Sequence, residues 1–152
     1  MTPLQALQAK YGLTVLLDGD RLVVHPEPQD KRLREGIDRN RERIVSELRR
    51  RWSEADQELA NTVMALEAGF LGAERAFREC LRIARQAAAR FVIQEPCKRC
   101  RGRLWWRLPA DHPQAPLICY KCAPPPDHVV PRMFESVVEE RISRPSAARG
   151  GR

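Results

Sequence analysis

Four cysteines in the second half of the chain are arranged as two closely spaced pairs. Cys97 and Cys100 form one C-x-x-C motif, and Cys119 and Cys122 form another, with eighteen residues between the motifs. This spacing is typical of two zinc knuckles that face each other across a ribbon. Four thiolates fill a tetrahedral zinc site and leave no position for water, so we expect one structural zinc ion, Zn2+.

The fifth cysteine and the odd total argue against a disulfide framework. Cys80 lies far from the two motifs within an apolar helical pattern, and we interpret it as a small core residue. A thioredoxin-like redox site would need a single motif in a βαβ context. We recognise no secretory signal and no apolar run of the roughly 20 residues that a membrane span needs. We therefore expect a cytoplasmic protein with reduced thiols and no membrane partner.

Positive charge is concentrated around the cysteine motifs. The formal net charge is +7 and the isoelectric point is about 9.6, which favours a polyanionic partner such as nucleic acid. Alternation along a strand sends Trp105 and Trp106 to opposite faces, so one indole should stay exposed as a base-stacking platform. The residues predicted to contact nucleic acid, DNA more readily than RNA, are Arg82, Arg85, Arg90, Lys98, Arg99, Arg101, Arg103, Trp105, Trp106, Arg107 and Lys121.

A second interpretation of this basic region, without a binding partner, stays open. Helix ends favour arginine, and the charges could form a generic basic surface without a partner. A second basic stretch, at residues 31–51, is interleaved with acidic residues at helical pairing distances. We interpret that stretch as a solvated helix with internal ion pairs.

Regular structure around the cysteine motifs is predicted to be short. Residues 103–108 and 116–119 have the pattern of strands. A proline run after Cys122 interrupts regular structure. Residues 131–142 are predicted to form one further helix around Met133 and Val137, and residues 143–152 to be a disordered basic tail.

The first 52 residues show the signals of a helix, a hairpin and a second helical region. Residues 4–11 have apolar side chains at helical spacing. Residues 13–17 and 21–25 are rich in valine and leucine and flank an Asp-Gly-Asp sequence, which is a strong signal for a tight turn. Asp30 can cap the helix that follows, which Gly36 could divide into two.

This order of elements resembles the TubC-type N-terminal docking domain, found at the start of some polyketide and nonribosomal peptide synthetase subunits. The resemblance implies a homodimerising α/β unit whose exposed hairpin captures a short tail of a larger protein. The remaining residues resemble no condensation or carrier module, so a role in peptide or polyketide synthesis is not expected. The segments that carry the resemblance are Leu4-Gln5-Ala6-Leu7, Gly12-Leu13-Thr14-Val15, Leu17-Asp18-Gly19-Asp20-Arg21-Leu22-Val23-Val24 and residues 33–49.

The outer face of the predicted hairpin is the candidate docking surface. An extended partner segment could add along an open strand edge there, because unpaired backbone groups are a template for another strand. The alternative is that the hairpin only covers its own helices with the inward side chains. The predicted docking residues are Thr14, Arg21, Val23 and His25.

Residues 53–93 are predicted to form a helical segment. Ser53, followed by acidic residues, is a helix-start signal. Gly69 and Gly72 weaken a helix interior, so we favour two antiparallel helices hinged there over one long helix that pairs with another chain. Apolar residues at heptad-like spacing should be buried, and they are Leu59, Val63, Leu66, Phe70, Ala73, Phe77, Cys80, Ala84, Ala87 and Phe91.

These patterns predict an α+β protein with four parts. They are a helix-hairpin-helix docking and dimerisation module at residues 1–52, a helical segment at 53–93, a four-cysteine zinc ribbon at 94–126, and a short helix with a basic tail at 127–152. We recognise no nucleophile with a matched base and no open metal site, so we do not expect an enzyme.

Two functions agree with these features. The first is a non-enzymatic accessory protein that binds nucleic acid through the zinc ribbon and docks, as a homodimer, to a larger replication, repair or mobile-element protein. The second is a protein–protein docking adaptor in which the zinc ribbon is purely structural. The fold class alone does not choose between them.

Overall fold

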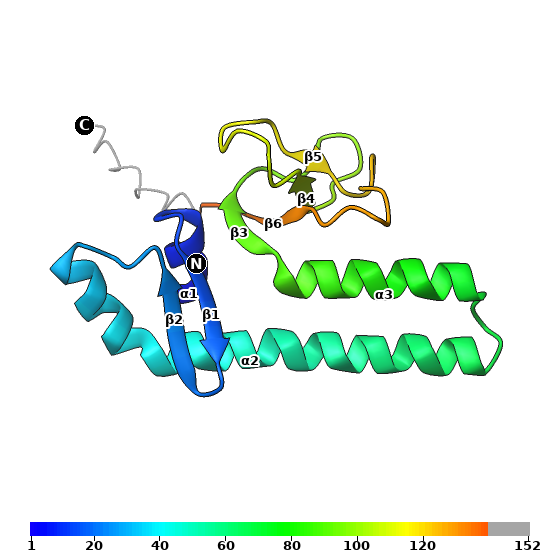
Figure 1. The fold of residues 1–152 in the computed structure, drawn as a ribbon, viewed down its shortest axis with the longest axis horizontal. Coiled ribbons are helices and arrows are strands. Elements are labelled where there is room, and N and C mark those ends of the chain that lie inside the picture. The colour runs from blue at the N-terminus through cyan, green and yellow to red at the C-terminus, as the bar shows by residue number, and fades with distance from the viewer. Residues whose placement is uncertain (140–152) are drawn as a thin grey trace, which may run out of the picture.

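One long helix spans the length of the molecule (Figure 1). The computed structural model describes residues 1–139, and α2 (Lys31–Glu67) accounts for 37 of them. At about 1.5 Å per residue, this helix is about 55 Å long. It begins at the predicted cap, because the Asp30 carboxylate accepts a hydrogen bond from the backbone N–H of Arg32 at 2.9 Å.

The helix start predicted at Ser53 is wrong. α2 continues through this position, and Arg50 forms an ion pair with Glu54 across it at 2.8 Å. A capping residue starts a helix only where the preceding chain is not already helical, and neither proline nor glycine follows Gly36 within α2. Gly36 itself does not divide the helix. The predicted boundary after residue 52 therefore falls inside a continuous helix.

The N-terminal segment folds against the first half of α2. α1 (Pro3–Ala9) is followed by β1 (Thr14–Asp18) and β2 (Arg21–His25), which pair antiparallel around a Gly19-Asp20 turn. Gly19 has φ of +61°, a left-handed conformation that suits glycine. These elements lie at the predicted positions. The most deeply buried side chains are Leu4 of α1, Val15 of β1 and Ile44 of α2.

A second helix doubles back along α2. α3 (Ala73–Ala88) follows a short turn in which Gly69 has φ of +79°. The two helices run antiparallel and lie side by side (Figure 1). The predicted hinge between two helices is confirmed, but α3 ends before Phe91, which lies in a strand. Within residues 1–139 no helix combines the length and apolar character that crossing a bilayer requires.

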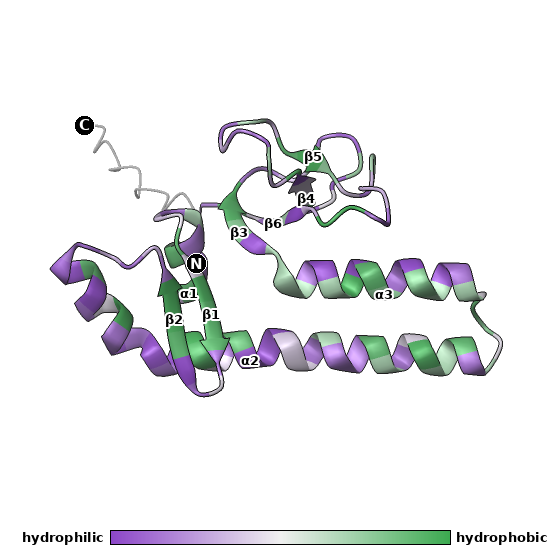
Figure 2. Ribbon diagram, viewed as in Figure 1, coloured by the Kyte–Doolittle hydropathy of each residue, from purple (hydrophilic) through white to green (hydrophobic). Residues whose placement is uncertain are grey.

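The apolar stripe on this helix pair is only partly buried. Hydrophobic segments occur along both helices (Figure 2), yet Phe70 is 84% exposed and Phe77 is 55% exposed. Cys80 is half-buried. The expectation that the stripe is buried within one chain is therefore wrong. The buried side chains between the helices are instead Ala55, Thr62, Ala76 and Ile83.

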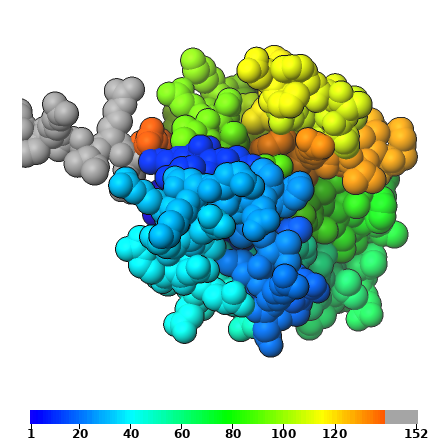
Figure 3. All heavy atoms as spheres, turned by 60° about the vertical axis from the view of Figure 1, so that its left-hand side comes forward, coloured from blue at the N-terminus to red at the C-terminus, as the bar shows by residue number. Residues whose placement is uncertain are grey.

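The second sheet joins strands that are far apart in the sequence. Its order is β3 (Arg90–Ile93), β6 (Arg132–Val137), β4 (Leu104–Arg107) and β5 (Ile118–Cys119). β6 is parallel to β3 and antiparallel to β4. Figure 3 shows the blue N-terminal segment next to the green and orange segments of this sheet. The strands β4 and β5 lie within predicted strands, whereas β3 falls in the predicted helical segment.

The helix predicted at residues 131–142 is wrong. The segment forms β6 as far as Val137, because its backbone groups pair with two neighbouring strands. Its side chains alternate between faces, so Met133 packs with Trp106 on one side and Phe134 packs with Trp105 on the other. The end of the predicted helix and the predicted tail, residues 140–152, lie outside the described residues.

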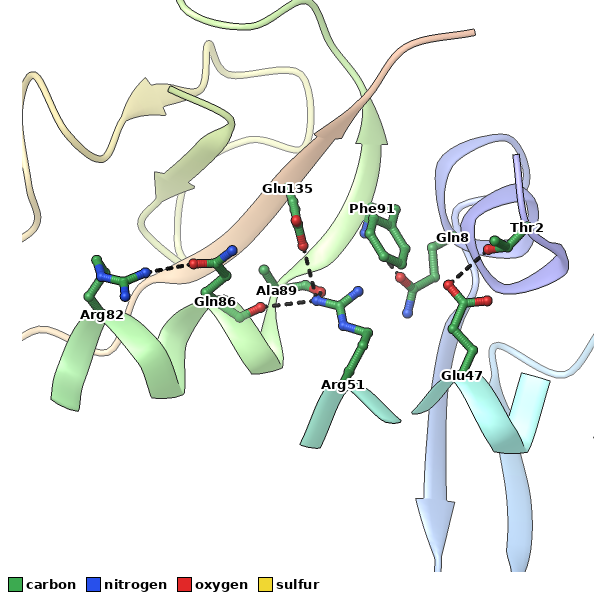
Figure 4. A network of polar contacts seen from close by, with 9 residues as sticks. All are labelled: Thr2, Gln8, Glu47, Arg51, Arg82, Gln86, Ala89, Phe91 and Glu135. Atoms are coloured by element: carbon green, nitrogen blue, oxygen red, sulfur yellow. Dashed lines mark hydrogen bonds and ion pairs between the residues drawn. The ribbon is translucent and has the colours of Figure 1, made fainter. Parts of the chain in front are cut away.

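Arg51 joins the long helix to the second sheet (Figure 4). Its Nη2 donates to the backbone oxygens of Gln86 at 3.0 Å and Ala89 at 3.1 Å, and it lies 3.2 Å from a carboxylate oxygen of Glu135. Its guanidinium carbon is 4.3 Å from the centroid of the Phe91 ring. Burial lowers the pKa of Arg51 and raises the pKa of Glu135, so desolvation acts against both charges. The ion pair offsets this cost only while both partners are present.

The first helix reaches the same junction. The side-chain oxygen of Gln8 accepts a hydrogen bond from the backbone N–H of Phe91 at 3.0 Å, and both groups are buried. The hydroxyl of Thr2 donates to a carboxylate oxygen of Glu47 at 2.9 Å. In Figure 4 both contacts lie to the right of Arg51. The N-terminal segment, α2 and the second sheet therefore meet through polar contacts as well as apolar packing.

Replacing Arg51 with methionine should destabilise the protein by about 2 kcal/mol, because Glu135 would keep a half-buried charge without a cation. Arg50→Met is the matched control. The pair between Arg50 and Glu54 is exposed on both sides, so its removal should cost less than about 0.5 kcal/mol. Urea unfolding followed by tryptophan fluorescence gives both values. Equal destabilisation by the two variants would contradict this role of Arg51.

Candidate metal centre

The four predicted ligands converge at one place on the second sheet. Cys97 and Cys100 lie between β3 and β4, Cys119 ends β5, and Cys122 follows it. The four Sγ atoms lie within 4.8 Å of one another, with 3.4 Å between Cys100 and Cys119 and 3.9 Å between Cys97 and Cys122. Four sulfurs bound to zinc at about 2.3 Å would be about 3.8 Å apart, so the cluster fits a tetrahedral ion.

The backbone of the first motif is shaped to bring its sulfurs together. The carbonyl of Cys97 accepts a hydrogen bond from the N–H of Arg101 at 2.7 Å, and its N–H donates to the carbonyl of Gly102 at 2.9 Å. Arg101 has φ of 59°, a left-handed conformation that tightens the turn. The N–H of Gly102 donates to the sulfur of Cys100 at 3.3 Å. Such a donor stabilises a thiolate and orients it toward the metal.

Hydrogen bonding separates the pKa values of the thiols. Backbone N–H groups of Cys100 and Arg99 donate to the sulfur of Cys97 and lower its pKa to about 7. A hydrogen bond with the sulfur of Cys100 raises the pKa of Cys122 to about 12, and burial raises the pKa of Cys119. A metal ion has to displace the protons that these thiols carry. Binding at this site therefore strengthens as pH rises.

Tightly packed groups cover the cysteine cluster on the side of Cys119, whereas Cys122 is exposed. Trp105 and Phe134 are buried in one cluster with Cys119, and the indole N–H of Trp105 donates to the hydroxyl of Ser136 at 2.6 Å. Gly102 lies where the two cysteine motifs meet. A Cβ at this position would lie 3.2 Å from the sulfur of Cys100, 3.7 Å from that of Cys119 and 3.8 Å from the Cβ of Lys121. The close contact between the two motifs therefore depends on a glycine, which has no side chain, at position 102.

Both tryptophans of the predicted stacking platform are buried. Trp105 and Trp106 are each 8% exposed. Their side chains do alternate between the faces of the sheet, but each face is covered, one by the cysteine cluster and the other by Ala89 and Met133. The indole N–H of Trp106 donates to the carbonyl of Ala123 at 2.7 Å. The expectation of an exposed indole is therefore wrong, and neither ring is free to stack on a base.

Four of the predicted nucleic-acid residues are engaged within the protein. Arg82, Arg85, Arg90 and Arg107 each donate a hydrogen bond to another residue of the chain. Arg82 is the most fully neutralised, because two glutamates lie within ion-pair distance at 3.6 and 2.7 Å. The guanidinium of Arg85 lies over the ring of Tyr120. These interactions hold the four guanidinium groups in place, and among them only Arg82 is also neutralised by carboxylates within residues 1–139.

Five predicted cations are exposed on the two cysteine motifs. They are Lys98, Arg99, Arg101, Arg103 and Lys121, which we call the cysteine-motif patch. Within residues 1–139 none of them lies within ion-pair distance of a carboxylate. The close approach of Gly102 to Lys121 brings the two parts of the patch together. Positive charge that forms no ion pair within residues 1–139 therefore lies directly around the predicted metal ligands.

The predicted docking residues share the outer face of the β1–β2 pair. The antiparallel register places Thr14, Arg21, Val23 and His25 on this face. Sequence reasoning missed Leu16, which pairs with Val23 and is 57% exposed. The signal for it was present, because Val15 points inward and its neighbour must point outward. This face thus combines apolar and basic side chains with the carboxylate of Asp18, which is opposite Arg21.

No protein-family model matches the chain, and neither a curated protein nor a solved structure is detectably similar to it. The likeness of the N-terminal elements to a docking domain stays a prediction. A function for the protein therefore rests on its own residues and their geometry.

Replacing Gly102 with alanine should weaken zinc binding about tenfold, because the new Cβ would displace the sulfur of Cys100. Gly36→Ala is the matched control, since a Cβ there meets no atom within 4 Å and favours the helix. Competition with a chromophoric chelator measures both affinities, and one zinc per chain is expected. Equal affinity of the two variants would contradict the close packing assigned to Gly102.

Proposed function

We propose that the protein is a non-enzymatic zinc protein that binds nucleic acid through the cysteine-motif patch and docks to a larger protein through its N-terminal segment. The observation that carries this proposal is the position of five exposed cations on the turns that hold the four cysteines. The docking-domain resemblance suggests that the partner is another, larger protein, and nucleic-acid binding by this chain suggests one that acts in replication, repair or a mobile element. Reduced thiols and bound zinc favour the cytoplasm.

The patch suits phosphate recognition for electrostatic reasons. Its five cations repel one another in the free protein, and a polyanion would relieve this repulsion while releasing its own counterions. A structural zinc ion in a ribbon would hold both turns rigid, so binding would cost less conformational entropy. Because Trp105 and Trp106 are buried, we propose that the patch binds the phosphate backbone. Such binding carries little sequence preference.

The zinc-loaded protein should bind short DNA with an affinity that falls steeply between about 50 and 200 mM salt. The triple variant Lys98→Gln, Arg99→Gln, Lys121→Gln should bind more weakly, because it removes three exposed charges of the patch. On duplex DNA, the slope of log K against log salt should fall by about 0.9 for each phosphate that the variant no longer neutralises. Fluorescence anisotropy on single- and double-stranded DNA and RNA measures these quantities.

The triple variant Arg39→Gln, Arg41→Gln, Arg43→Gln is the matched control. It removes the same charge from exposed positions of α2, outside the cysteine motifs, and should bind DNA as the wild type does. Equal weakening in the two triple variants would mean that net charge alone attracts DNA. If the wild-type protein binds no nucleic acid even at low salt, the nucleic-acid function is rejected and the adaptor function remains.

The helix pair carries an exposed apolar surface that indicates a further protein contact. In an antiparallel pair, the apolar rows of α2 and α3 fall on the same side, next to the buried interface between the helices. Exposed apolar groups of this size usually mark an interaction site. We call this surface the helix-pair face, and its exposed members are Trp52, Val63, Leu66, Phe70 and Phe77.

We propose that a second copy of the chain covers the helix-pair face. Residues 53–67 of α2 carry four acidic side chains and no basic one, whereas α3 carries four arginines and two glutamates. A two-fold arrangement that lays α2 of one copy against α3 of the other matches these opposite charges. The product is an antiparallel four-helix arrangement, a common way to bury such stripes. This dimer does not use the outer face of the hairpin.

Phe77→Gln should convert the dimer to a monomer, because it places a polar group in the middle of the helix-pair face. Met64→Gln is the matched control: Met64 is 65% exposed, but it lies about 200° around α2 from buried Thr62. Light scattering at micromolar concentration reports the mass of each. A monomeric wild type, or dissociation of both variants, would rule out this dimer.

A further inference from the structure

Three arginines meet on one face of the second sheet. In the register, Arg107 of β4 is opposite Arg132 of β6, and Arg90 of β3 is opposite Phe134 of β6. Cross-strand partners point to the same side of a sheet, and so do residues two apart along a strand. Arg90, Arg107 and Arg132 therefore surround Phe134, on the face that also carries Trp105.

Two of the three guanidinium groups are fixed in place by the fold. The guanidinium carbon of Arg107 lies 4.8 Å from the centroid of the Phe134 ring, and its Nη1 donates to the carbonyl of Pro113 at 2.5 Å. Arg90 donates through Nη2 to the carbonyl of Gly12 at 3.0 Å. Interactions with carbonyls and rings leave the positive charge in place. Most of the N–H donors on each group also stay available, since a guanidinium carries five.

Nothing in the described part of the chain neutralises this cluster. Within residues 1–139 none of the three arginines lies within ion-pair distance of a carboxylate. The Nε of Arg107 is buried and has no hydrogen-bond partner among these residues. Burial lowers the pKa of Arg90, and the neighbouring charges of Arg132 and Arg107 lower it further. An unpartnered buried donor beside repelling cations is costly unless an acceptor arrives.

We infer that Arg90, Arg107 and Arg132 form a binding site for a phosphate group. The planar, forked donors of arginine match the oxygens of a phosphate, and charge-assisted hydrogen bonds of this kind are short and strong. A bound phosphate would accept from free Nη donors of the three guanidinium groups and separate three like charges. Arg132 is not recognisable as a site residue from the sequence, because only the pairing of the strands brings Arg90 and Arg107 close to it.

This site does not require the proposed function, but it extends that function where it holds. Arg107 is two residues from Trp105 along β4, a distance of about 7 Å, so the arginines and the cysteine cluster occupy one sheet face. A nucleic-acid backbone that lies on the cysteine-motif patch could place a neighbouring phosphate at the three arginines. The phosphate would then belong to the backbone rather than to a free anion.

Inorganic phosphate is the probe that tests the site on the zinc-loaded protein. Phosphate should shift the Nε–H NMR signal of Arg107 and raise the melting temperature, relative to sodium chloride at equal ionic strength. Arg132→Gln should weaken phosphate binding about tenfold, because it removes one charge-assisted hydrogen bond to the anion. Arg132 is exposed, so this variant should keep its fold, which the unchanged far-UV circular dichroism would verify.

Arg43→Gln is the control, because it removes one exposed arginine of α2 that lies outside the cluster. It should bind phosphate as the wild type does. A response to phosphate no larger than the response to chloride would overturn the site. Equal weakening by Arg43→Gln and Arg132→Gln would also overturn it, because net charge alone would then account for binding.

DNA binding, measured in parallel, separates this inference from the proposed function. Phosphate binding that depends on Arg132, in a protein that binds no DNA, would keep the arginine site and reject the nucleic-acid function. DNA binding by the wild type and by Arg132→Gln alike, with no phosphate response, would keep the function and reject the site. Weaker binding of both ligands by Arg132→Gln would support the backbone as the source of the phosphate.

Discussion

The fold depends on the insertion of β6 between β3 and β4, because this strand connects all the other parts of the molecule. β6 is only six residues long, yet its side chains reach in turn the end of α3, the cysteine cluster, α2 and the N-terminal core. Its parallel pairing with β3 closes a loop of about forty residues, which is entropically costly. The side chains that make these connections are Met133, Phe134, Glu135, Ser136 and Val137.

A metal ion at the four cysteines would stabilise the same sheet by linking its two edge strands. β3 and β5 are the edge strands, and the two cysteine motifs follow one and end the other. A sheet whose strands are two to six residues long buries little apolar area, so it gains much from a cross-link between its edges. Binding energy at a structural zinc site is folding energy. The pairing of β6 and the cysteine cluster therefore support each other.

The features that the sequence predicts correctly have causes within a few residues. Gly19 adopts the positive φ that the turn requires, Asp30 caps α2, and the C-x-x-C spacing brings two sulfurs together. Ser53 shows the limit of this reasoning, because its local start signal is overridden by the helix that already precedes it. A local signal decides the structure only where the neighbouring chain leaves the choice open.

The features that the sequence does not predict depend on interactions between distant segments. Met133 and Val137 fit a helical period as well as a strand, and only the pairing with β3 and β4 selects the strand. Alternation correctly separates Trp105 from Trp106, but it carries no information on what covers each face.

The distribution of charge distinguishes two parts of this basic protein. On α2, acidic residues are interleaved with the cations and some pairs form, as in Lys31–Glu35 and Arg50–Glu54, although Arg39, Arg41 and Arg43 form no ion pair within residues 1–139. On the second sheet, the cations lie on turns and on one strand face, where within residues 1–139 no carboxylate lies within ion-pair distance of the cysteine-motif patch or the three arginines. These uncompensated charges lower the stability of the free protein through mutual repulsion. The apolar packing of β6 and a metal ion would offset this cost, and an anion that binds only the folded state would remove part of it. Stability and anion binding are then linked at the same sheet. A substitution that removes an exposed cation such as Arg132 should accordingly stabilise the free protein while weakening its complex, a pattern opposite to that of a purely structural arginine such as Arg51.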